Sequence, residues 1–160
     1  MRRLSVVLIL LLWICTGAAK TISGKVIAVK DGDTIVVLKN KSSYTIRLDG
    51  IDCPEKRQAF GDRAKRFASD RVFGKQVRVQ YSKKDRYQRY LGDVYYNGNK
   101  CLNRELLKAG LAWHYKQYNK NPELAKLEQN ARKRKEGLWA DAYPKAPWDF
   151  RRTKKPKNKA

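Results

Sequence analysis

The sequence predicts an α+β fold, in which a small five-stranded β-barrel carries three helices packed at one end. The first observation is a set of five short segments rich in β-branched residues and joined by turn residues. The second is a switch to helical spacing of apolar residues at three other places. The resulting order is three strands, a helix, two strands and two helices, which suits a barrel with antiparallel turns.

The strands are defined by alternation and by the turns between them. Asp31-Gly32 is a hairpin signal between the first two segments. In YTIRLD, residues 44–49, apolar and polar side chains alternate, so Arg47 points away from the apolar face. The predicted strands are 21–29, 34–40, 44–49, 75–81 and 89–98.

The helices are defined by spacing and by caps. Ala64 and Phe67 follow helical spacing after Gly61, and Gly74 is a stop signal. The last helix has an asparagine cap, Asn121, followed by proline, early acids and late bases. The predicted helices lie within 61–74, 101–110 and 121–137.

The chain divides into three parts. Residues 1–19 have two arginines, a short apolar run and small residues before Lys20, which is typical of a signal peptide. A permanent anchor is the weaker alternative, because the apolar run falls short of the roughly 20 residues that span a bilayer. Residues 20–150 have the size of one domain, and 151–160 read as a basic disordered tail. The sequence therefore predicts a secreted or periplasmic protein with no membrane span after cleavage.

The charge indicates what kind of partner the protein has. The formal net charge is +22, with 37 basic and 15 acidic residues. Such an excess attracts polyanions and gives information about partners rather than about the fold. Nucleic acid is the first candidate partner, and an anionic membrane surface is the second. A membrane-surface protein is disfavoured because no basic amphipathic helix with a strong apolar face is evident, unless the last helix serves.

The inventory of reactive residues excludes several chemistries. His114 is the one histidine, so mechanisms that need two imidazoles are not available within one chain. We expect His114 to serve in packing or in a contact with the edge of the substrate, rather than as a base. The sequence has no glycine-rich phosphate loop, no serine-elbow motif and no CxxC pair. Cys53 and Cys101 could form a disulfide after export, although sequence alone cannot place them within bridging distance.

Carboxylates and guanidinium groups remain. Asp31 and Asp33 lie at a turn that opens one strand, and Asp52 and Glu55 lie in the loop that closes the next strand. Closure of a barrel could bring these two loops together. Oxygen ligands suit a hard cation such as calcium or magnesium. With Arg47 and Arg89, such an ion would form a site for the charge that builds on a phosphodiester during cleavage.

Four ordered blocks carry a family resemblance. They are VIAVKDGDTIVVL, IRLDGIDCPE, DRYQRYLGDVY and LNRELLKAGLAWHY, and they resemble successive blocks of the thermonuclease, or staphylococcal nuclease-like, family from about Ile22 to Trp139. The resemblance implies an OB-fold barrel, a hydrolase that cleaves DNA and RNA with calcium, and products that carry 3′-phosphates. We expect a monomer that acts on single-stranded or frayed nucleic acid.

The resemblance also implies roles for individual residues. Asp33, Asp52 and the backbone carbonyl of Cys53 correspond to calcium ligands, while Asp31 and Thr34 support them. Glu55 corresponds to the general base, and Arg47 and Arg89 to the arginines that bind the phosphate. Arg86, Tyr87 and Tyr118 correspond to residues that contact a nucleotide in the family. Apart from the resemblance, the aromatic residues Tyr87, Trp113 and Tyr115 lie near the proposed groove and could stack on unpaired bases, with packing in the core or at its rim as the alternative.

Two positions depart from the family pattern. Gln88 stands where many relatives have glycine, and a positive φ there would cost roughly 1 kcal/mol and could displace Arg89. Cys53 follows the loop aspartate where threonine or alanine is frequent, which a ligand on the backbone should tolerate. The alternative function is a non-catalytic OB-fold module that binds nucleic acid. It is disfavoured because such a module has no need for acids that face a polyanion.

Overall fold

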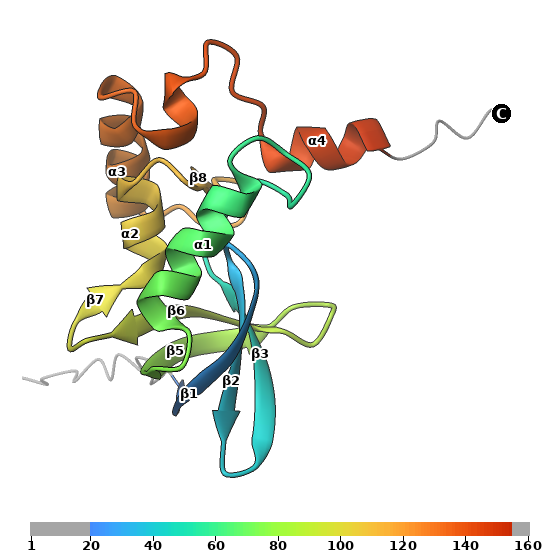
Figure 1. The fold of residues 1–160 in the computed structure, drawn as a ribbon, viewed down its shortest axis with the longest axis vertical. Coiled ribbons are helices and arrows are strands. Elements are labelled where there is room, and N and C mark those ends of the chain that lie inside the picture. The colour runs from blue at the N-terminus through green and yellow to red at the C-terminus, as the bar shows by residue number, and fades with distance from the viewer. Residues whose placement is uncertain (1–19, 155–160) are drawn as a thin grey trace, which may run out of the picture.

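The described part of the chain, residues 20–154 of a computed structural model, forms a β-barrel covered at one end by helices (Figure 1). In chain order the elements are β1 Lys20–Asp31, β2 Thr34–Lys39, β3 Ser42–Leu48, β4 Ile51–Asp52, α1 Gly61–Val72, β5 Gln76–Lys84, β6 Tyr90–Tyr96, β7 Lys100–Cys101, α2 Leu102–Lys108, β8 Trp113–His114, α3 Pro122–Lys133, the 3₁₀-helix η1 Gly137–Ala140 and α4 Pro147–Lys154.

The barrel closes through one parallel strand pair. β1 pairs antiparallel with β2 and β5, β2 pairs antiparallel with β3, and β5 pairs antiparallel with β6. The remaining edges meet when β3 pairs parallel with β6, with Ile46 opposite Tyr90 and Leu48 opposite Gly92. This closure confirms the five-stranded barrel and leaves β3, with Arg47, between two strands.

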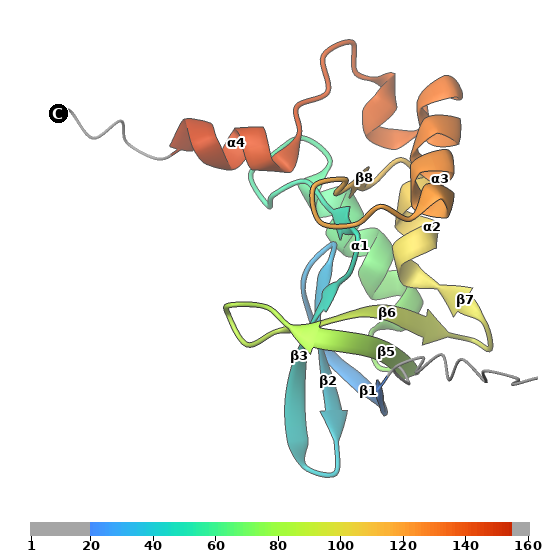
Figure 2. The same ribbon diagram turned by 180° about the vertical axis from the view of Figure 1, so that it is seen from behind.

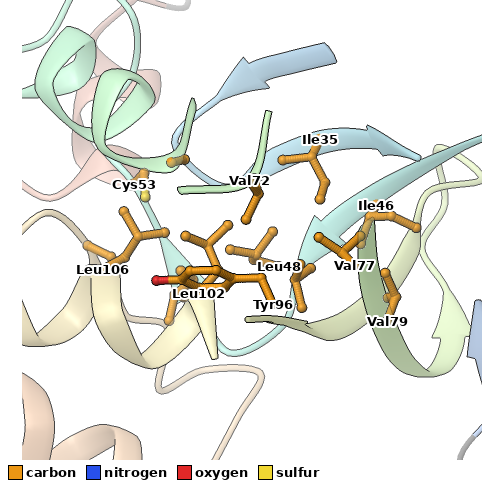
Figure 3. Packing of buried hydrophobic residues seen from close by; sticks show 14 of the residues in the cluster. Ile35, Ile46, Leu48, Cys53, Val72, Val77, Val79, Tyr96, Leu102 and Leu106 are labelled. Atoms are coloured by element: carbon orange, nitrogen blue, oxygen red, sulfur yellow. The ribbon is translucent and has the colours of Figure 1, made fainter. Parts of the chain in front are cut away.

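The core lies inside the barrel and under the helices that cover it. Inward residues from the strands, such as Ile35, Ile46 and Val79, are fully buried. Leu102 and Leu106 of α2 pack on the same cluster (Figure 3). At about 25 cal/mol for each Å² of apolar surface removed from water, this burial is the main stabilising contribution to the fold. The barrel is therefore a rigid base for the loops at its covered end.

Four α-helices are present among residues 20–154, whereas the sequence analysis expected three. α1, α2 and α3 fall within the predicted ranges, and Asn121 caps α3 by accepting a hydrogen bond from the Glu123 N–H at 2.8 Å. α4 is additional, and so are the two-residue strands β4, β7 and β8. These strands are too short to leave an alternation pattern, and α4 lies where charge alone indicated a tail.

The first residues of the segment that was expected to be a tail are helical. Residues 151–154 continue α4, although the sequence analysis assigned them to a disordered extension. Residues 155–160 and the predicted signal peptide, 1–19, lie outside the described residues. Within residues 20–154, no helix has the length and apolar character needed to cross a membrane.

The two described cysteines are free thiols. Cys53 lies in the core cluster beside the acidic loop, and Cys101 lies at the start of α2. Both are buried. The disulfide that export would permit is therefore not formed in this structure.

Candidate active site

Two acidic loops meet at the covered end of the barrel. Leu48 at the end of β3 donates its N–H to the Asp33 carbonyl at 2.9 Å, which joins the loop before β2 to the strand that carries Arg47. Gly32 allows this approach, because a Cβ atom there would lie 2.9 Å from the Cys53 sulfur. The Cys53 N–H completes the contact by donating to Asp33 Oδ2 at 2.7 Å.

Arg47 is the centre of the resulting cluster. Its Nη1 lies 2.9 Å from Asp33 Oδ2, and its Nη2 lies 2.8 Å from Asp52 Oδ1. Nη1 also donates to the Ile51 carbonyl at 3.0 Å. The side chains of the two aspartates are 8% and 2% exposed, so the arginine holds two buried carboxylates together. Despite the opposing effect of burial, Asp33 and Asp52 raise the pKa of Arg47 above its ordinary value.

The site carries more negative charge than Arg47 can balance. Burial raises the pKa of Asp52 above its ordinary value, despite the neighbouring arginines. Partial desolvation and the charges of Asp33 and Glu55 also raise the pKa of Asp31, which lies on the rim. Burial raises the pKa of the Cys53 thiol well above its ordinary value, so this group remains protonated. The acids therefore repel one another around a point where a further cation would be stabilising.

A second arginine, Arg151 of α4, partly supplies that positive charge. Its Nη2 lies 2.8 Å from Asp52 Oδ2, and its Nη1 lies 2.7 Å from Glu55 Oε1. These contacts outweigh the cost of burial and raise the pKa of Arg151. The sequence analysis missed this residue by placing it in the tail. The signal that could have found it is Pro147 followed by an early acid and two late bases, which is a helix pattern.

Arg89 lies apart from the carboxylate cluster and pairs with Asp85. The Arg89 Nε and Nη2 atoms each lie 2.7 Å from Asp85 Oδ2. Burial opposes ionisation of Asp85, but hydrogen bonds and the charge of Arg89 keep its pKa below the ordinary value. Arg89 also lines an open groove of about 800 Å³ that extends to Asp31 and Thr34. The groove connects the turn that carries Arg89 with the rim of the acidic cluster.

The turn before Arg89 contains the backbone conformation that the sequence analysis raised as a concern. Gln88 has φ 62°, a left-handed value that favours glycine. We expect Gln88→Gly to stabilise the protein by about 1 kcal/mol, because it removes the clash of a Cβ atom in this conformation. Urea unfolding measures the change in free energy.

The matched control for this substitution is Gln80→Gly in the extended strand β5. The backbone at Gln80 is extended, so glycine there removes no strain. Because glycine loses more conformational entropy on folding, the substitution should lower the free energy of unfolding by about 0.5 to 1 kcal/mol. Equal changes at the two positions would show that the turn at Gln88 is not strained.

The aromatic residues expected to contact nucleic acid differ in how accessible they are. Tyr87 and Tyr118 are 64% and 71% exposed, and Arg86 lies over the Tyr87 ring at 4.8 Å. Trp113 is packed edge-on against Trp139 and Trp148. The Trp148 ring stacks on Tyr115, with centroids 5.2 Å apart and planes within 4°. His114 is buried.

Comparison with known proteins identifies the family. A family model described as staphylococcal nuclease homologue matches residues 45–141, which include Arg47, Asp52, Glu55 and Arg89. The chain belongs to the staphylococcal nuclease family.

Several relatives match almost the whole domain of this staphylococcal nuclease family member. The chain is 44% identical over 133 residues to a protein of Escherichia coli named "Uncharacterized endonuclease", covering 83% of this chain and 87% of the relative. It is 45% identical over 132 residues to a protein of the same name from Haemophilus influenzae, covering 82% and 74%. It is also 39% identical over 142 residues to "Micrococcal nuclease" of Shigella flexneri, covering 82% of each chain.

The donor atoms at the candidate site of this staphylococcal nuclease family member are oxygens, the kind of ligand that binds a hard cation. Asp33 and Asp52 offer carboxylate oxygens, and Cys53 adds a backbone carbonyl as the expected further ligand. The raised pKa values of Asp31 and Asp52 reflect burial together with the crowding of negative charge that such an ion would relieve. No group of three or more His, Cys, Asp or Glu side chains within residues 20–154 is arranged as a complete ligand set. A cation here would therefore complete its shell with water or with oxygens of a substrate.

Proposed function

We propose that this chain is an exported, calcium-dependent nuclease that hydrolyses phosphodiester bonds in DNA and RNA with little sequence specificity and leaves 3′-phosphates. The observation that carries the proposal is the buried cluster in which Arg47 holds Asp33 and Asp52 together. Arg151 connects this cluster to Glu55, because it forms salt bridges with both Asp52 and Glu55. Acids gathered in one cluster of a strongly basic protein have no use in binding a polyanion alone, but they can hold a cation and activate water.

The proposed roles follow from chemistry and position. Asp33, Asp52 and the Cys53 carbonyl would hold calcium, and a bound calcium ion would supply positive charge against a phosphate oxygen. Glu55, half-buried at the start of the next loop, accepts a proton from the attacking water. Arg47 and Arg89 donate to the equatorial oxygens, where negative charge builds during the displacement. Arg89 must exchange Asp85 for phosphate to do so.

The rest of the molecule delivers the polymer. The net charge of +22 concentrates nucleic acid at the surface and makes binding sensitive to salt. The exposed rings of Tyr87 and Tyr118 can stack on unpaired bases, which favours single-stranded or frayed substrate. We propose that the protein acts in the periplasm or after secretion, because residues 1–19 have the pattern of a signal peptide. We also propose that it acts as a monomer.

The direct test is cleavage of labelled single-stranded DNA, duplex DNA and RNA of one shared sequence by the purified protein. We expect all three to be cut in calcium, with single-stranded DNA and RNA cut faster than duplex. Replacing calcium with a chelator should slow cleavage at least about 100-fold, because the charge on the phosphate is no longer neutralised. Mass analysis of the fragments identifies which end carries the phosphate.

The controls separate catalysis from binding. Magnesium at the same concentration as calcium tests the choice of ion, and a gel-shift assay in chelator tests binding without cleavage. Binding of all three substrates without cleavage in either ion would reject the nuclease and support the alternative, a nucleic-acid-binding module. Cleavage that is unaffected by the chelator would reject the role of calcium.

A further inference from the structure

α4 lies across the loop that carries Glu55. The views from both sides place α4 beside the loop between β4 and α1, at the helical end of the barrel (Figures 1 and 2). The segment before α4 is fixed to this loop by Gln58, whose Nε2 donates to the Lys145 carbonyl at 2.6 Å and whose Oε1 accepts from the Glu55 N–H at 3.1 Å. Pro147 at the start of the helix is buried. The helix therefore has a defined seat on the site.

Arg151 forms salt bridges with two carboxylates that the proposed reaction needs. One guanidinium group bonds both the expected calcium ligand Asp52 and the expected general base Glu55, at 2.8 and 2.7 Å. A carboxylate that accepts these charge-assisted hydrogen bonds is less available to a metal ion, and the positive charge repels that ion. The arginine thus holds the position of a cation without being able to perform its chemistry.

A second side chain of α4, Trp148, covers an aromatic ring of the expected binding surface. It lies one helical turn before Arg151 and stacks flat on Tyr115, which is one of the rings expected to meet a base. Its other contact, edge-on to Trp113 at 5.5 Å, anchors it to the aromatic cluster under α3. The Trp148 indole of α4 therefore stacks where a nucleotide base would bind. The Arg151 guanidinium group places a positive charge where a cation would bind.

We infer that α4 is a built-in lid that inhibits the enzyme, in which Arg151 competes with the divalent cation for Asp52 and Glu55 while Trp148 covers Tyr115. This inference rests on the proposed function. Calcium or nucleic acid must displace the lid, so the C-terminal helix sets the calcium concentration at which the enzyme becomes active.

The test compares calcium affinity in variants of α4 by isothermal titration calorimetry, without substrate. Arg151→Ala removes the competing charge and should lower the calcium Kd about tenfold. Trp148→Ala releases the other anchor without changing the charge and should also lower the Kd, by a smaller factor. Melting temperatures of both variants verify that the barrel remains folded.

The matched control is Arg152→Ala. It removes the same charge from the same helix, but the Arg152 side chain is 77% exposed, and its one salt bridge within residues 20–154 is to Asp149 at 3.6 Å. Its calcium Kd should remain within about twofold of the parent value, because a solvent-exposed charge contributes little. In cleavage assays, Arg151→Ala should be more active than the parent at low calcium and equal to it at saturating calcium.

The outcomes distinguish this inference from the proposed function. Equal calcium Kd values for Arg151→Ala and Arg152→Ala would overturn the lid, while calcium-dependent cleavage by all variants would leave the proposed function standing. A weaker calcium affinity in Arg151→Ala would also overturn the lid and make Arg151 a residue that positions the expected ligand Asp52. Absence of calcium binding in every protein would overturn the lid and the calcium requirement together.

Discussion

Glu55→Gln is expected to lower kcat for cleavage of single-stranded DNA by about 10² to 10⁴-fold, the usual contribution of a general base. Glutamine has the size of glutamate but cannot accept the proton of the attacking water. The calcium Kd should not weaken, because the expected ligands are Asp33, Asp52 and the Cys53 carbonyl. KM should change little as well, so the measurement is a full kinetic comparison at saturating calcium rather than a single rate.

Glu136→Gln is the matched control for this substitution. Glu136, like Glu55, is half-exposed and pairs with one arginine side chain, Arg134, at 3.6 Å. It lies between α3 and η1, as the N-cap residue of η1, and forms no salt bridge with the acidic cluster within residues 20–154, so its loss should leave kcat within about twofold of the parent. A Glu55→Gln protein that cleaves as fast as Glu136→Gln would remove Glu55 from the mechanism.

Arg47→Met is expected to destabilise the protein by about 3 to 5 kcal/mol, in addition to its effect on cleavage. Methionine preserves much of the apolar stem, but Asp33 and Asp52 lose the charge that holds them together while they remain buried. The value should lie near the lower end, because Arg151 still pairs with Asp52. Urea unfolding in chelator measures the free energy without a contribution from bound metal.

The pH dependence of this loss identifies its cause. Burial already raises the pKa of Asp52, and Arg47 is one of the groups that oppose this rise. Without Arg47 the pKa rises further, so the charged form of Asp52 is what disfavours folding. The penalty is therefore present above the folded-state pKa and decreases as the pH falls through it. We expect the difference in stability between parent and variant to be smaller at pH 5 than at pH 8.

Arg78→Met in β5 is the control for lost packing. Arg78 lies over the Tyr95 ring at 4.4 Å and forms no salt bridge within residues 20–154. Its replacement should cost less than about 1 kcal/mol at either pH. If Arg47→Met is no less stable than Arg78→Met, the buried ion pairs contribute nothing that a neutral side chain cannot replace.

The barrel could be predicted from sequence because its signals are local. Alternation in residues 44–49 placed Arg47 on the polar side of a strand, and Asp31-Gly32 marked the turn before β2. The neighbouring hairpin then fixes the register in which Thr34 faces Arg47. Asp33 and Asp52 meet because the loops that carry them flank strands that are adjacent in both sequence and space.

The lid could not be predicted in the same way, because its contacts are distant in sequence and polar. Arg151 and Asp52 are 99 residues apart, and no periodicity of apolar residues connects them. The pattern that begins at Pro147 predicts a helix, but in a chain with 37 basic residues it does not show which arginine of that helix meets Asp52. The pairing of Arg89 with Asp85 was hidden for a different reason. The two residues are close in sequence, but the sequence does not show whether the Asp85 carboxylate faces Arg89 or the solvent.

The parallel contact between β3 and β6 has a consequence for how the chain reaches its native state. Ile46 meets Tyr90 only after the intervening segment, with α1 and β5, has been looped out, so this contact carries a large loss of chain entropy. Hairpins such as β1 with β2 can form within microseconds, whereas a barrel seam of this kind belongs to topologies that fold in milliseconds to seconds. We therefore expect assembly of the seam to be the slow step of folding, and until it forms β3, which carries Arg47, lacks its pairing with β6.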